Sequence, residues 1–125
     1  MFLLDTNIIL EIFLEQEKSI LCENFLNANI GKLAITDFTL HSIGIILFRH
    51  ERQRIFDAFI SEMLDKINIL SMPAVEFISI SSYSDETGLD FDDTYQCLVA
   101  KTFDLTIITM DNDFKKAIDV KVKFL

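Results

Sequence analysis

Three short motifs that contain aspartate are spread over the whole chain. They are Asp5-Thr6-Asn7, Asp92-Asp93 and Thr109-Met110-Asp111, and the first and third follow the strand-like runs Met1–Leu4 and Leu105–Ile108. In an open parallel sheet, ligands bind outside the carboxyl ends of the strands. Carboxylates gathered there repel one another unless a cation lies between them. Because Mg²⁺ and Mn²⁺ prefer hard oxygen ligands, the sequence predicts a site for one of these ions.

The hydrophobic pattern predicts a single α/β domain, residues 1–125, with a mainly parallel central sheet. Strand-like runs are Met1–Leu4, Leu33–Ile35, Ile67–Leu70, Thr106–Ile108 and an edge strand at Val120–Phe124. Helix-like runs are 5–13, 18–29, 37–47, 52–66, 73–86, 93–100 and 111–117. Strands that alternate with helices favour a parallel sheet. The strand-free stretch 37–66 predicts a pair of helices that stands out from the sheet.

Each aspartate also has an ordinary structural interpretation. The predicted helix caps are Asp5, Thr36 or Asp37, and Asp92 or Asp93. Asp111 followed by Asn112 is typical of a turn. The metal-site interpretation therefore depends on the combination: Asp5 and Asp111 both follow strands, and their side chains are expected to meet in one crevice.

Composition limits the classes of function. The net charge of −9 argues against a large, non-specific nucleic-acid surface, because phosphate contacts need Lys and Arg. Arg49, Arg52 and Arg54 leave room for a small basic rim. No apolar run is long enough to cross a bilayer, and the N-terminus lacks a signal-peptide pattern. Cys22 and Cys97 are expected to be buried, reduced thiols of a cytoplasmic protein.

Taken in order, the acidic motifs resemble those of the PIN domain family of metal-dependent nucleases, which includes ribonuclease toxins of toxin–antitoxin pairs. Residues 3–7 resemble the opening strand and first catalytic aspartate, residues 89–94 the third acidic motif, and residues 105–114 the last strand with its Thr-x-Asp motif. The resemblance covers essentially the whole chain and implies a three-layer α/β/α domain. It implies the catalytic residues Asp5, Asp93 and Asp111, and metal ligands drawn from these three and Asp113.

One position departs from the family pattern. The second motif of the family is a glutamate on the helix after the second strand, and that position falls on Ser42. A hydroxyl is a weaker ligand for a hard cation than a carboxylate, and it adds no negative charge. Ser42 therefore bears directly on whether the chain is an active enzyme.

The resemblance implies a Mg²⁺- or Mn²⁺-dependent endoribonuclease in which a metal-bound water attacks the phosphodiester. Thr6 or Asn7 is expected to orient one of the carboxylates. An RNA substrate, an antitoxin partner, a homodimer and a cytoplasmic location are implied as well. Two alternatives stay open. A degenerate PIN domain would bind RNA or a protein without cleaving, which Ser42 favours. A phospho-acceptor receiver-like domain also gathers acids at strand ends, but no lysine follows the strand at Ile107-Ile108.

Overall fold

The structure, a computed structural model, describes all residues from 1 to 125. A five-stranded sheet forms its centre, with the strand order β3-β2-β1-β4-β5 and every pair parallel. The strands are β1 (Phe2–Leu4), β2 (Leu33–Thr36), β3 (Asn68–Leu70), β4 (Thr106–Thr109) and β5 (Lys121–Phe124). The α-helices are α1 (Thr6–Phe13), α2 (Ser19–Ala28), α3 (Asp37–Arg49), α4 (Gln53–Met63), α5 (Ile80–Thr87) and α6 (Phe91–Thr102). Three short 3₁₀ helices are η1 (Leu64–Lys66), η2 (Ala74–Ser79) and η3 (Asn112–Lys116).

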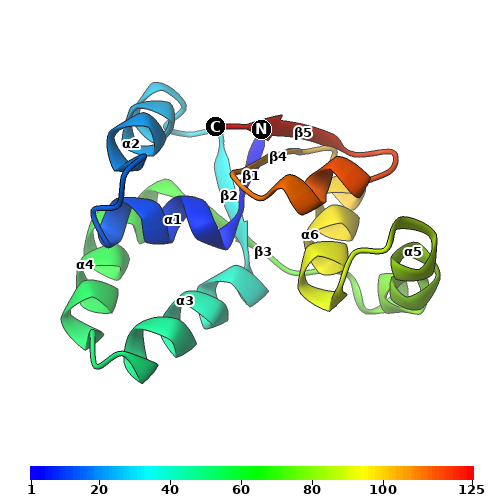
Figure 1. Ribbon diagram of the computed structural model, residues 1–125, viewed down its shortest axis with the longest axis horizontal. Helices are drawn as coiled ribbons and strands as arrows, with labels where there is room; N and C mark the ends of the chain where they lie inside the picture. Colours follow the sequence, from blue (N-terminus) through cyan, green and yellow to red (C-terminus); the bar gives the residue numbers. More distant parts are fainter.

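Helices cover both faces of the sheet, which gives three layers (Figure 1). Leu3 and Ile107 point into a core shared with α5 and α6, whereas Leu4 and Ile108 point into a core shared with α1 to α4. Strands buried on both faces are hydrophobic without alternation, which explains the continuous apolar runs of β1 and β4. The predicted three-layer α/β/α fold is confirmed.

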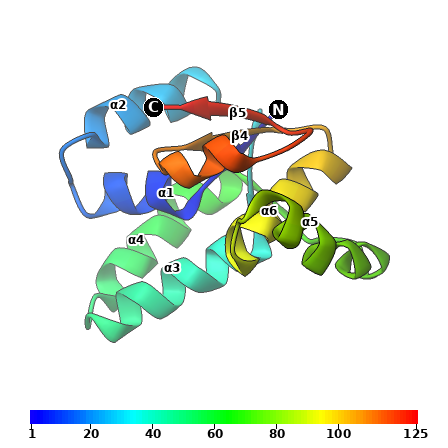
Figure 2. The same ribbon diagram turned by 45° about the vertical axis from the view of Figure 1, so that its right-hand side comes forward.

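The pair of helices predicted from the strand-free stretch is also confirmed. Helices α3 and α4 pack against each other and form a hairpin that extends from the body of the molecule, as both views show (Figures 1 and 2). Ile43, Leu47 and Phe59 anchor the hairpin in the core. The edge strand β5 and the short helix η3 also lie where the sequence predicts them.

The helix caps follow the sequence in two cases and differ in a third. Asp5 caps α1, and Thr36 caps α3 through a hydrogen bond that its Oγ1 accepts from the Thr39 N–H at 2.9 Å. The prediction that Asp92 or Asp93 caps α6 is wrong, because Asp90 occupies that position. Asp90 has extended backbone angles, so the helix begins two residues earlier and both other acids lie in its first turn.

The order of the strands creates a crevice at the centre of the sheet. The chain passes from β1 to β2 and β3 on one side, and it places β4 and β5 on the other side of β1. The carboxyl ends of β1 and β4 therefore flank the point where the strand order reverses, which is where open α/β sheets bind ligands. The Asp5 N–H donates to the carbonyl of Ile108 at 2.9 Å and keeps these two strand ends together.

Two further expectations concern the cysteines and the membrane. Cys22 and Cys97 are both free and buried, as predicted. None of the helices combines the length and the apolar character that crossing a membrane requires.

Candidate active site

The carboxylate of Asp5 lies at the centre of the crevice and is held by neutral donors. Its Oδ1 accepts hydrogen bonds from the Thr6 N–H at 2.7 Å and from Gln96 Nε2 at 2.8 Å. Its Oδ2 accepts from the hydroxyl of Thr109 at 2.7 Å. These donors come from α1, α6 and β4, so three elements fix one side chain that is only 6% exposed.

Thr109 joins Asp5 to the third acidic motif. Its hydroxyl donates to Asp5 and accepts from the Asp111 N–H at 2.9 Å and from Asn7 Nδ2 at 3.3 Å. One donation and two acceptances use the full capacity of a hydroxyl. Thr6 or Asn7 was expected to orient a carboxylate: the Thr6 N–H donates to Asp5, whereas the Asn7 amide contacts Thr109. We call Asp5, Asn7, Thr109 and Asp111 the strand side of the site.

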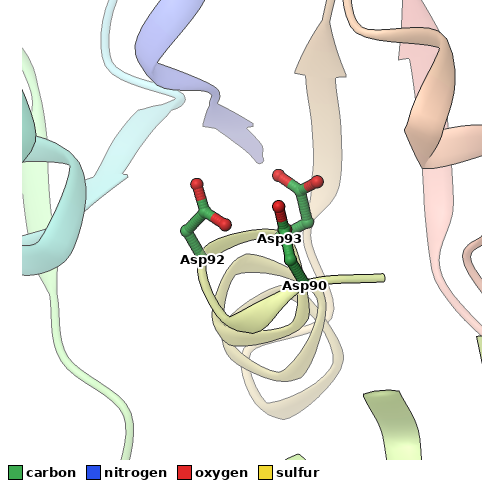
Figure 3. A group of neighbouring side chains, drawn as sticks. All are labelled: Asp90, Asp92 and Asp93. Atoms are coloured by element: carbon green, nitrogen blue, oxygen red, sulfur yellow. The ribbon is translucent and has the colours of Figure 1, made fainter. Parts of the chain in front are cut away.

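A second set of acids stands at the start of α6. The carboxyl groups of Asp90, Asp92 and Asp93 have oxygens within 4.8 Å of one another. Figure 3 shows them together on the first turn of the helix, on the side that faces the strands. Asp90 and Asp92 are exposed, whereas Asp93 is only 8% exposed. We call these three residues the helix side of the site.

The two sides meet at Asp93. Oxygens of Asp93, Asp111 and Asp113 also lie within 4.8 Å of one another, so Asp93 belongs to both close groups. Asp113 is exposed, and its N–H donates to Asp111 at 2.9 Å. Asp5 belongs to neither close group, although its charge helps to raise the pKa of Asp93 and the charge of Asp111 helps to raise the pKa of Asp5 itself. The structure thus brings Asp93, Asp111 and Asp113 into one close group and leaves Asp5 outside it.

Electrostatics distinguish the acids from one another. Burial, and then the negative charges of Asp90 and Asp92, raise the pKa of Asp93 to about 8. Burial also raises the pKa of Asp5, and the hydrogen bonds from Gln96 and Thr109 oppose that shift. A hydrogen bond with Asp92 lowers the pKa of Asp90. The carboxylate shared by both groups is therefore the one that most resists ionisation.

No cationic side chain neutralises the buried acids. The single ion pair of the structure joins Lys116 Nζ to Asp113 at 3.7 Å, and both side chains are more than half exposed. Asp5, Asp93 and Asp111 pair with no Lys or Arg. Like charges this close favour either a proton or a bound cation.

The donor set fits a hard divalent ion. Both close groups contain only carboxylates and no His or Cys, which suits Mg²⁺ or Mn²⁺ rather than a softer metal. A neutral oxygen on the helix that carries Asp93 is also unpartnered: Gln96 Oε1 is buried without a hydrogen-bond partner, while Nε2 of the same amide donates to Asp5. An oxygen-rich site with an unpartnered buried acceptor is one into which such a cation fits.

Two other polar positions of α3 differ in their surroundings. Asp37 accepts hydrogen bonds from the Tyr95 hydroxyl at 2.7 Å and from the Ser71 hydroxyl at 3.0 Å. These bonds tie α3 to α6 and to the chain after β3, so Asp37 has a structural role away from the close groups. Ser42 is half-buried, and no hydrogen bond joins its hydroxyl to any of the acids.

The arginines of the expected basic rim lie far from the acids. Arg49, Arg52 and Arg54 are exposed at the tip of the α3–α4 hairpin (Figure 2). Helix α3 begins beside α6 and runs outward for its 13 residues, which is roughly 20 Å at the usual rise per residue. Cations closer to the site are Lys115 and Lys116, in η3 directly after Asp111 and Asp113.

Sequence reasoning missed Gln96 and the linking role of Thr109. A signal for Gln96 was present: it follows Asp93 by three positions, so the two share a helix face, and it is a polar residue within the apolar run 95–100. The link from the Thr109 hydroxyl to Asp5 and Asn7 could not be predicted, because both residues lie more than 100 positions away in the sequence.

The model of one protein family, the PIN domain, matches residues 2–119, and the chain belongs to this family. Among solved structures, VapBC2 from Rickettsia felis bound to a promoter DNA fragment is similar, with a TM-score of 0.77 and 18% identity over 98% of this chain and 97% of that one. FitAcB from Neisseria gonorrhoeae has a TM-score of 0.73 and 23% identity over 98% and 96%. A toxin–antitoxin complex from Klebsiella pneumoniae has a TM-score of 0.71 and 23% identity over 91% and 90%. A search of the curated proteins found no significant match.

Proposed function

We propose that this PIN domain is a Mg²⁺- or Mn²⁺-dependent endoribonuclease and the toxin of a toxin–antitoxin pair. The observation that carries the proposal is the crowding of Asp93 with Asp111 and Asp113 at the carboxyl edge of the sheet, within 4.8 Å and without a neutralising lysine or arginine on Asp93 or Asp111. Membership of the family and the likeness to solved toxin–antitoxin structures support the same assignment.

Each residue has a distinct task in the proposed reaction. A bound divalent ion supplies a water of lowered pKa and positive charge for the phosphate under attack. Asp93, Asp111 and Asp113 would hold the ion on the exposed side, and Asp5 would face it from behind. Thr109 donates to Asp5 and so opposes the rise of its pKa, and Asn7 holds Thr109 in that orientation. Lys115 lies on the adjoining η3, where it is suited to contact an RNA phosphate.

Cleavage of RNA by the purified protein tests this function. A mixed-sequence RNA oligonucleotide and the DNA of the same sequence are incubated with millimolar Mn²⁺, Mg²⁺ or EDTA. We expect cleavage of RNA with either ion, none in EDTA, and none by Asp93→Asn prepared in the same way, which excludes a contaminating nuclease. Equal cleavage by the variant, or in EDTA, would contradict the proposal.

The alternative is a PIN domain that binds RNA or a protein but does not cleave. Ser42 favours it, since the family has a glutamate at that position and a hydroxyl adds no negative charge to the acids. The same experiment separates the two functions. Metal binding without cleavage, at any metal concentration or RNA sequence, would assign the chain to the non-cleaving class.

The surface of the α3–α4 hairpin supports the proposed antitoxin partner and homodimer. Leu40, Gly44, Ile45, Phe48 and Phe56 line an apolar groove on it, and the side chains of Ile45 and Phe48 are 51% and 52% exposed. Exposed apolar patches of this kind mark surfaces that associate with other proteins. Light scattering of the isolated chain gives its oligomeric state, and Phe48→Glu should reduce association without unfolding the domain.

A further inference from the structure

Among the fully buried side-chain oxygen and nitrogen atoms, Oε1 of Gln96 is the one that has no hydrogen-bond partner. Gln96 lies on α6, three positions after Asp93 and on the same face of the helix. Only 3% of the residue is exposed, so water outside the protein does not reach its amide. Nε2 donates to Asp5 Oδ1 at 2.8 Å, and Oε1 has no partner.

The hydrogen bond to Asp5 fixes the direction in which Oε1 faces. Turning the amide over would bring its oxygen against a carboxylate oxygen, and two acceptors repel each other unless a proton lies between them. The donor therefore stays with Asp5, and the acceptor is left without a partner on a side chain that shares its helix face with Asp93. Buried acceptors are almost always satisfied, so an unsatisfied one next to a candidate metal site calls for an ion or an ordered water.

We propose that Gln96 belongs to the divalent-cation site and serves the ion as a neutral oxygen acceptor, a role that rests on the proposed metal-dependent function. The side chain then has two tasks at once: its Nε2 holds Asp5 in place, and its Oε1 completes the oxygen environment of the cation. A neutral oxygen adds coordination without further repulsion among acids that already crowd one another. It also compensates in part for the hydroxyl of Ser42, at a position where a carboxylate would otherwise supply an oxygen.

Substitution of Gln96 separates its two tasks. Gln96→Met has a similar length and volume but neither donor nor acceptor, whereas Gln96→Glu keeps an oxygen and loses the donor. Calorimetric titration with Mn²⁺ is expected to give at least about a tenfold weaker affinity for Gln96→Met, as for the loss of other groups that support metal ligands. Gln96→Glu should bind Mn²⁺ at least as tightly as the unmodified protein.

Salt concentration controls for the charge that Gln96→Glu adds. A long-range effect of charge weakens as salt rises, whereas a contact with the ion or its water persists, so both variants are measured at low and high KCl. If Gln96→Met binds Mn²⁺ as tightly as the unmodified protein, the proposal is wrong. If Gln96→Glu binds no better than Gln96→Met, Gln96 only positions Asp5, and the proposal is again wrong.

A crystal of the unmodified protein soaked in Mn²⁺ keeps the test independent of variant folding. Oε1 is expected to contact the ion or a water bound to it, and anomalous scattering identifies the ion. Mn²⁺ bound with Oε1 still unpartnered would overturn the role of Gln96 but leave the proposed function intact. No Mn²⁺ bound to the unmodified protein would overturn the proposed function itself.

Discussion

The two sides of the acidic crevice differ in what surrounds their carboxylates: neutral hydrogen-bond donors on the strand side and other carboxylates on the helix side. On the strand side, Asp5 receives three hydrogen bonds from neutral donors, and Thr109 links it to Asn7 and Asp111. On the helix side, Asp93 stands close to other carboxylates, and its pKa is raised to about 8. The strand side is thus complete in itself, whereas the helix side is satisfied only by protons or a cation.

This difference suggests how the site is prepared for an ion. On the strand side, three hydrogen bonds hold the Asp5 carboxylate in place without metal, although burial still raises its pKa. The helix side stores repulsion that a divalent ion relieves. Substitutions that look equivalent in the sequence should therefore have opposite effects on the stability of the metal-free protein.

The largest expected effect comes from neutralising one acid on each side. Asp93→Asn and Asp5→Asn should each lower Mn²⁺ affinity and RNA cleavage by at least about 100-fold, more than the loss of a supporting residue. In EDTA above about pH 8, where Asp93 is ionised in the folded protein, Asp93→Asn should be more stable than the unmodified protein, because one crowded charge is gone. Asp5→Asn should be less stable by about 1–3 kcal/mol, because one of its buried donors is left without an acceptor. Urea unfolding in EDTA measures both free energies.

If Asp93→Asn and Asp5→Asn change the free energy of unfolding in EDTA in the same direction, the distinction between the strand side and the helix side is wrong. Asn112→Ala is a matched control, since Asn112 is an exposed polar residue next to Asp111 outside both close groups. It should leave the free energy of unfolding and the Mn²⁺ affinity nearly unchanged.

The dependence on pH sharpens the same comparison. The pKa of Asp93 is raised in the folded protein, so the folded state holds this proton more tightly than the unfolded chain. The contribution of Asp93 to stability without metal is present below about pH 4, the unfolded pKa, and is lost as the pH rises through about 8. Metal binding releases the proton, so Mn²⁺ affinity should rise by up to about tenfold per pH unit over that window. The free energies of unfolding and the Mn²⁺ affinities of the unmodified protein and of Asp93→Asn are measured over this pH range, and their difference gives the contribution of Asp93. A difference that does not change with pH would contradict the raised pKa of Asp93.

A carboxylate introduced at Ser42, on α3, tests the site from a third element. If Ser42 faces the crevice, Ser42→Glu should tighten Mn²⁺ about tenfold and raise RNA cleavage, because it adds a hard ligand and a negative charge. The same variant should be less stable in EDTA. Asp5→Asn in the Ser42→Glu background should abolish the gain. An unchanged Mn²⁺ affinity would show that Ser42 points elsewhere.

The sequence predicted the fold because the fold depends on local patterns. Of the predicted acids, the structure brings Asp93, Asp111 and Asp113 together and leaves Asp5 outside both close groups. Apolar runs on β1 and β4 indicate strands buried on both faces, and an acid that follows each of them must lie at one edge of a parallel sheet. What the sequence could not provide is the contact network between distant segments. The hydrogen bond from Gln96 to Asp5 joins residues 91 positions apart, and no periodicity encodes the direction of an amide. The cap of α6 was misassigned because three acids at positions 90, 92 and 93 are all suitable caps, and packing selects among them.

The smallest expected effect concerns the cations around the site. Lys115→Gln should reduce the slope of RNA affinity against salt by about one, the value for one phosphate contact. A variant in which Arg49, Arg52 and Arg54 are all changed to Gln should show a smaller change in this salt slope per charge removed, because these side chains lie at the far tip of the hairpin. Neither change should affect folding, since all four side chains are exposed. A steeper loss of slope for the arginines would place the RNA along the hairpin instead.

Thermal unfolding in a titration of Mn²⁺ tests the central claim most directly. A ligand that binds only the folded state stabilises it by about 2.7 kcal/mol at 100 times its dissociation constant. The account predicts that the Tm of the unmodified protein rises steadily with Mn²⁺ and returns to its starting value in EDTA, while that of Asp93→Asn stays constant. An unchanged Tm at millimolar Mn²⁺, or an equal rise for Asp93→Asn, would contradict a divalent-cation site between the two sides of the crevice.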